Sequence, residues 1–225
     1  MRLLGQTPLA FQHTLSQTTR PTVTRVNGRG GEPVDELEAR LVALVRGSPV
    51  LMRALRAARS VNPPDWVIGA GAIRDRVWDH LHGFTRATPV QDVDLAFFDP
   101  VSLNGERERG VQRTLTAQAP ELAWDVTNQA GVHLWYPEVF GVDVRPLTST
   151  SDAVATWPET ATTIGVRLLS DDTIRVVAPY GLDDLFGLVC RRNPRRATRE
   201  QYRRRVETKR IAKRWPRVRI LDAGD

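Results

Sequence analysis

The chain has 225 residues and a net charge of +6, and its 41% hydrophobic and 26% charged residues match ordinary globular usage. A single cysteine, Cys190, excludes an intrachain disulfide and any metal site built from several thiolates. The sequence has no run of about 20 apolar residues, the length that a membrane span requires, so we expect a cytoplasmic protein without a membrane partner.

Residues 1–33 form the first segment in chain order, and we expect them to be a disordered tail. They end in the glycine- and proline-rich string NGRGGEP, a pattern typical of a hinge. Because residues 1–31 contain arginine and threonine but no acids, a targeting segment is the alternative. Residues 34–225 are predicted to form a single domain.

The domain begins with two predicted helices that end near residue 60. Short apolar strands then alternate with helices, in the order strand 66–68, helix 72–82, strand 93–97, helix 106–118 and strand 122–126. Residues 127–160 are expected to be irregular, and three further elements follow: a hairpin (162–169 with 173–177), an apolar helix (182–189) and a basic helix (198–214). This order predicts an α/β or α+β fold.

The positive charge is concentrated in residues 191–219, which contain 14 Arg and Lys residues against two Glu, a local charge of +12. The rest of the chain therefore carries about −6. A basic helix of this kind can contact the phosphates of an RNA, with Tyr202 and Trp215 stacking on bases. Alternatively, it balances the acidic body of the protein, and the sequence leaves both interpretations open.

A candidate metal site begins at Asp92 and Asp94, which alternate with Val93 and Leu95 in the pattern of a strand. Residues two apart in a strand point to the same face, so the two carboxylates lie side by side and repel each other. Mg²⁺ is bound by one or two carboxylates together with phosphate oxygens, which suits this pair. The alternative is a pair of solvated acids on a sheet edge.

Two further features lie close to this pair in the predicted fold. Gly69 and Gly71 stand between a strand and a helix, where a backbone without side chains can approach a phosphate at the helix N-terminus. Asp125 lies on the third strand and adds a third carboxylate if that strand neighbours the one with Asp94. The alternatives are a plain tight turn for the glycines and a capping acid for Asp125.

The runs GAGAIRDRVWDHLHG (69–83) and QDVDLAFFD (91–99) resemble the signature of the DNA polymerase β-like nucleotidyltransferase superfamily. The Arg74-Asp75 step is also similar to a stretch of tRNA CCA-adding enzymes and poly(A) polymerases. A bacterial nucleotidyltransferase-like family, formerly of unknown function, resembles the chain over about residues 35–219. Its matching strings are WDVTNQAGVHLW (124–135), WPETATTIGVRL (157–168), APYGLDDLF (178–186) and K-x₅-WP (209–216).

The resemblance implies a polymerase β-like core, a small mixed sheet flanked by helices, with the basic helix at its C-terminal end. It implies that Asp92 and Asp94 ligate Mg²⁺ or Mn²⁺, with Asp125 as the third acid. It also implies that Gly69 and Gly71 hold the triphosphate of an NTP. The chain departs from the pattern, because it reads Gly-Ala-Gly and lacks the later nucleotide-selecting motifs of CCA-adding enzymes. A CCA-adding role is therefore not expected.

Four further residues are candidates for nucleotide binding, each with a plainer alternative. Arg74 could reach a phosphate or be solvated, and Lys209, together with Arg205, could bind the triphosphate. Asn128 and His133 follow Asp125 and could contact base, sugar or phosphate, or else cap a turn and pack in the core.

The leading hypothesis is a metal-dependent enzyme that transfers an NMP group from an NTP to an unidentified acceptor hydroxyl, with Asp92, Asp94 and Asp125 as catalytic residues. RNA is the expected acceptor if the basic helix binds it. The alternatives are an RNA-binding module with a vestigial transferase site, and a toxin-like transferase that acts on tRNA or protein.

Overall fold

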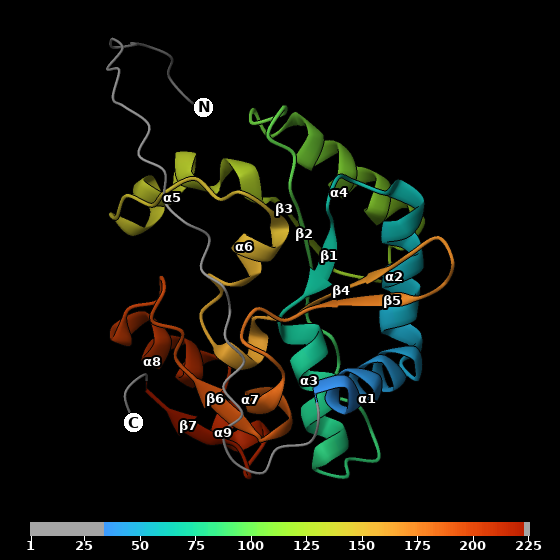
Figure 1. Cartoon of the computed structure of the whole chain (residues 1–225), viewed down its shortest axis with the longest axis vertical. Coiled ribbons are helices and arrows are strands. Elements are labelled where there is room, and N and C mark those ends of the chain that lie inside the picture. Colours follow the sequence, from blue (N-terminus) through green and yellow to red (C-terminus); the bar gives the residue numbers. More distant parts are fainter. Residues whose placement is uncertain (1–33, 223–225) are drawn as a thin grey trace. The chain divides into compact units, whose positions relative to one another are not determined.

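The computed structural model in Figure 1 describes residues 34–222, and its centre is a five-stranded mixed sheet. The strand order is β3-β2-β1-β4-β5, in which β2 and β3 are parallel and every other neighbouring pair is antiparallel. The strands are β1 (Val67–Gly69), β2 (Val93–Phe97), β3 (Trp124–Asn128), β4 (Gly165–Leu168) and β5 (Ile174–Val177).

Four helices build the main core on one face of the sheet: α1 (Val34–Arg46), α2 (Pro49–Val61), α3 (Gly71–Leu81) and α4 (Glu106–Gln118). As predicted, α2 starts at Pro49, and the hydroxyl of Ser48 caps it by accepting a hydrogen bond from the amide of Leu51. Its buried leucines, Leu51 and Leu55, recur four residues apart and therefore share one helical face. In Figure 1, α2 and α4 lie together on one side of the sheet.

The other face of the sheet is smaller and holds the polar residues that matter below. Val67 and Ala96 pack there against Val154 of the short helix α6 (Thr150–Val154), with the partly buried Trp157 beside them. Because side chains alternate across a strand, Asp94 lies on the same face as Ala96. The sheet thus separates an apolar helical core from a face that carries carboxylates.

Residues 127–160 are more regular than the sequence suggests. They contain a 3₁₀ turn (Gln129–Gly131), helix α5 (Val132–Phe140) and α6, and a second 3₁₀ turn follows at Thr160–Thr162. The expectation of an irregular segment is therefore wrong. Pro137 inside α5 hides the helix from sequence patterns, since proline usually ends one.

The C-terminal part also differs from the prediction. The expected helix over 182–189 is only one turn, α7 (Asp183–Phe186), and the chain then enters β6 (Val189–Arg191), which pairs in parallel with β7 (Arg219–Leu221). The basic helix is divided into α8 (Arg199–Thr208) and α9 (Ile211–Arg214). The break is at Arg210, whose φ of +51° is a left-handed conformation that a continuous helix does not contain.

The expected tail, residues 1–33, lies outside the described residues, and its predicted disorder stays a prediction. Within residues 34–222, no helix is long and apolar enough to cross a membrane.

Candidate active site

The acids predicted to bind metal come together on the sheet. Asp94 of β2 is the register partner of Asp125 on β3 and, across the other edge of β2, of Gly69 on β1. Asp92 lies two residues before Asp94. The pKa of Asp94 is raised to about 6 by its burial and by the charges of Asp92 and Asp125. Mutual repulsion of this kind is relieved by a cation.

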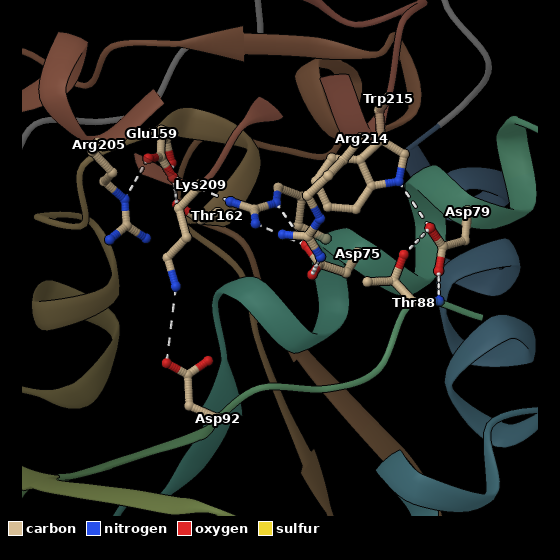
Figure 2. Close-up of polar contacts among 11 residues, drawn as sticks. Asp75, Asp79, Thr88, Asp92, Glu159, Thr162, Arg205, Lys209, Arg214 and Trp215 are labelled. Atoms are coloured by element: carbon tan, nitrogen blue, oxygen red, sulfur yellow. Dashed lines mark hydrogen bonds and ion pairs between the residues drawn. The ribbon is translucent and has the colours of Figure 1, made fainter. Parts of the chain in front are cut away.

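Two cations from the C-terminal segment face these acids. Nζ of Lys209 lies 4.0 Å from Oδ2 of Asp92, as Figure 2 shows. Arg205 on α8 lines the same pocket as Asp94 and Asp125. The positive charges of Arg205 and Lys209 act on the pKa of Asp94 in the opposite direction, lowering it. The predicted nucleotide-binding residue Lys209 is thus brought to the acids.

Arg205 is held by a glutamate that sequence reasoning did not single out. Glu159 is only 1% exposed and accepts a hydrogen bond from Nε of Arg205 (Figure 2). Its other carboxylate oxygen accepts from the hydroxyl of Thr162 at 2.9 Å. Glu159 belongs to the string WPETATTIGV, but nothing local in that string shows that its partner lies 46 residues further on.

Arg74 does not face the pocket. It is 2% exposed, and its Nε and Nη2 donate to Oδ1 of Asp75 at 3.0 and 2.7 Å. The guanidinium carbon lies 5.2 Å from the ring of Trp78 and 5.5 Å from that of Trp215. Oε2 of Glu159 lies 3.6 Å from its Nη1. The structure places Arg74 inside the core, where its charge lies between the carboxylates of Asp75 and Glu159.

The end of the basic segment anchors itself on α3. The indole nitrogen of Trp215 donates to Oδ1 of Asp79, and Nη2 of Arg214 donates to Oδ2 of Asp75, both at 2.8 Å (Figure 2). Trp215 is fully buried, and Tyr202 is buried with its hydroxyl donating to the backbone oxygen of Cys190. Of the two interpretations that the sequence left open, stacking of Tyr202 and Trp215 on bases is therefore not supported, because both rings are buried.

The two glycines of the predicted phosphate turn have different surroundings. A Cβ at Gly69 would lie 2.3 Å from Cη2 of Trp157 and 2.8 Å from the backbone oxygen of Ile164, so packing alone requires glycine there. A Cβ at Gly71 would meet only Nη2 of Arg74, at 3.9 Å. Between them, Ala70 has a φ of +56° and lines the pocket of the carboxylates. The N-terminus of α3 thus opens beside the acids.

Asn128 and His133 are not brought to the acids. The side-chain amide of Asn128 accepts from the backbone nitrogens of Asp99 and Ala130, and it donates to the backbone oxygens of Asp99 and Ser102. It therefore ties β3 to the loop after β2. His133 is partly buried on α5, with its Nδ1 lacking a hydrogen-bond partner, and lines neither of the two cavities described next.

Two adjoining cavities lie beside the sheet; Asp94 and Asp125 line the smaller one, whereas Asp92 lines neither. The carboxylate pocket, about 200 Å³, includes Asp94, Asp125, Ala70 and Arg205 in its lining. A larger space of about 790 Å³, here called the aromatic–basic cleft, lies between α5 and α8. The two share five lining residues: Thr127, Gln129, Trp157, Pro158 and Arg205. A small charged pocket therefore opens into a roomier cleft.

A small mixed sheet flanked by helices, with paired acids on adjacent strands beside a strand-to-helix glycine turn, defines the class of polymerase β-like nucleotidyltransferases. A nucleotidyltransferase family model matches residues 56–220, and the chain belongs to that family. It is therefore a nucleotidyltransferase, as predicted, and the predicted fold class is confirmed.

A solved structure supports the same conclusion. It is an NMR structure described as revealing a CCA-adding enzyme head domain, and it is 25% identical to this chain with a TM-score of 0.69. The match covers 82% of this chain and 96% of the other. A search of curated proteins found no match.

Proposed function

We propose that the enzyme transfers an NMP group from an NTP to the hydroxyl of an acceptor, with Mg²⁺ or Mn²⁺ held by Asp92, Asp94 and Asp125. The observation that carries the proposal is the register pairing of Asp94 with Asp125 in parallel strands, opposite the cations of α8. Acids and cations that face each other across a pocket suit a ligand with both phosphates and metal.

The three acids fit a hard cation because they offer only oxygen ligands, and their mutual repulsion raises the pKa of Asp94. Among residues 34–222, no group of three or more His, Cys, Asp or Glu side chains is arranged so that it could hold a metal ion. Mg²⁺ suits such an open arrangement, because it takes substrate phosphates and water as its remaining ligands. When bound, the metal would supply a Lewis acid for the phosphates.

Three features of the chain support binding of the triphosphate. The guanidinium of Arg205 and the ammonium of Lys209 can neutralise phosphate oxygens beside the acids. Backbone amides at the N-terminus of α3, an eleven-residue helix, can donate to the same group near Gly71. Arg74, Asn128 and His133 are left without a direct role in this proposal, because their side chains lie elsewhere.

In the proposed reaction, the acceptor oxygen forms a bond to the α-phosphorus of the NTP while the bond from that phosphorus to the bridging α–β oxygen breaks. Pyrophosphate leaves with the bond electrons. The proton of the acceptor hydroxyl passes to a carboxylate, for which Asp125 is the best placed, because it is exposed whereas Asp94 is partly buried. The acceptor that carries the hydroxyl is not identified by this proposal.

The experiment is label transfer from each α-labelled NTP in turn, with Mg²⁺ or Mn²⁺, to total RNA and a cell extract. The double variant Asp92→Ala/Asp94→Ala should lose transfer by at least a thousandfold, whereas Asp183→Ala, which removes an exposed acid on α7, should keep it. Thermal unfolding of all three proteins confirms that they are folded. Full transfer by the double variant would overturn the proposed site.

A further inference from the structure

We propose that the aromatic–basic cleft binds a single-stranded nucleic acid, with a terminal hydroxyl of the strand directed toward the carboxylate pocket. The inference rests on the proposed function and names the acceptor class for that transfer. It is carried by the charge of the cleft, by its aromatic wall and by its connection to the acids.

The charge of the lining is one-sided. Arg196, Arg204, Arg205 and Lys209 line the cleft, and among residues 34–222 no aspartate or glutamate lines it. This is notable because the carboxylate pocket, which adjoins it, contains Asp94 and Asp125. A groove that carries only positive charge attracts a polyanion, and phosphates of a nucleic acid backbone release counterions when they bind there.

The opposite wall is aromatic and comes from α5. The rings of Trp135 and Tyr136 are 6.0 Å apart, and those of Tyr136 and Phe140 are 4.4 Å apart. Phe140 is 45% exposed, so part of this wall is open to a ligand. The guanidinium of Arg196 lies 4.9 Å from the centre of the Tyr136 ring. Aromatic rings beside a basic track are the features that bind successive bases of a single strand.

The donor NTP does not account for all of these cations. An NTP carries its charge in the triphosphate, which the proposed function places at the acids near Arg205 and Lys209. Arg196 and Arg204 line the cleft but not the carboxylate pocket. Arg204 also pairs with Glu200, but both side chains are largely exposed and Glu200 does not line the cleft. The two arginines therefore fit a second source of negative charge, and the phosphodiesters of an acceptor strand supply it. Arg205, which lines both cavities, lies where donor and acceptor would meet.

The test is fluorescence anisotropy with a 5′-fluorescein-labelled ten-nucleotide RNA, the matching single-stranded DNA and a blunt RNA duplex. The protein is the full chain with Mg²⁺ at physiological salt. Arg204→Glu and Tyr136→Ala should each weaken binding of the single strands by about fivefold or more. Arg203→Glu is the matched control, because it makes the same charge change on the neighbouring exposed residue, which does not line the cleft. It should change binding by less than about twofold.

A fluorescent, non-hydrolysable ATP analogue measures the donor site separately in the same proteins, and its affinity should stay within about twofold in all of them. The inference is overturned by equal oligonucleotide affinity in all variants, by a duplex that binds as tightly as the strands, or by cleft variants that lose only the ATP analogue. If single strands bind through the cleft but no nucleotide is transferred, the proposed function and the acceptor role fail, and only the binding of single strands by the cleft stands. The oligonucleotide that binds with the higher affinity shows whether the cleft prefers RNA or DNA.

Discussion

Glu159, buried between the sheet and the C-terminal segment, accepts a hydrogen bond from the Nε of Arg205, whose side chain lines the carboxylate pocket. The same carboxylate lies 3.6 Å from the buried guanidinium of Arg74. Arg205 is therefore oriented by a residue that does not line the pocket itself. Losing the charge of Glu159 should disturb both the active site and the core. Losing Arg205 should disturb mainly the active site, because Glu159 keeps Thr162 and Arg74 as partners.

Glu159→Gln should weaken NTP binding and also lower the free energy of unfolding by about 1–3 kcal/mol, because Arg74 keeps Asp75 but loses its second carboxylate partner. Arg205→Ala should weaken NTP binding with a much smaller loss of stability, since its side chain is partly exposed. Urea unfolding and titration with the ATP analogue measure the two quantities. If Glu159→Gln binds the analogue like the natural chain, Glu159 does not position Arg205.

The acids of the site should destabilise the metal-free protein above neutral pH. The pKa of Asp94 is raised from 3.8 to about 6, so the folded chain binds this proton more tightly than the unfolded chain. The Asp94 carboxyl therefore contributes its full stabilisation below pH 4, and this contribution is lost as the pH rises through 6. In EDTA at pH 7.5, the free energy of unfolding of Asp94→Asn should therefore be about 1–3 kcal/mol higher than that of the natural chain. At pH 4 the difference should vanish. An equal effect at both pH values would contradict the assigned charge interaction.

The two glycines should respond oppositely to alanine. Gly69→Ala places a methyl group against Trp157 and the Ile164 backbone, so it should destabilise the fold by about 1–3 kcal/mol. In Gly71→Ala the methyl group makes only an ordinary contact with Nη2 of Arg74, at 3.9 Å, and should leave stability within about 1 kcal/mol. It should nevertheless weaken binding of the ATP analogue if the phosphate approaches the backbone at Gly71, as proposed. Normal analogue binding by Gly71→Ala would remove the glycine turn from the proposed site.

Trp215 should act as the anchor of the C-terminal segment. Trp215→Ala should cost about 3–5 kcal/mol, because it empties a buried position beside Trp78 and Arg74. Trp215→Phe keeps most of the volume and loses the hydrogen bond to Asp79, so it should cost about 1–3 kcal/mol. Urea unfolding at fixed pH checks the order of the two variants. Equal costs would show that the hydrogen bond to Asp79, which both variants lose, and not packing, holds the segment.

The sequence predicted the sheet and its acids well, because both follow from local patterns. Alternating residues placed Asp94 on a strand, although Asp92 lies just before β2, and the strand–helix order placed Asp125 on the next one. The roles of Arg74 and Asn128 could not be predicted in this way. Whether a polar side chain faces a pocket or the core depends on partners distant in sequence, such as Glu159 for Arg74 and Asp99 for Asn128.

The same limit applies to the aromatic residues. Tyr202 and Trp215 stand among basic residues in the sequence, which suggested a nucleic-acid surface, but the fold buries both. The exposed aromatic wall comes from α5, which Pro137 conceals from helix patterns. A residue's neighbours along the chain therefore did not indicate its neighbours across the cleft.

The break at Arg210 divides the basic segment into two parts. The part before it carries Arg205 and Lys209, and the part after it is attached to α3 by the hydrogen bond from Trp215 to Asp79. During synthesis, Asp94 leaves the ribosome more than one hundred residues before Arg205. Until α8 docks, the nascent protein holds repelling acids with no counter-charge from Arg205 and Lys209. The site would then become complete late in folding, when the C-terminal segment packs onto α3 through Trp215.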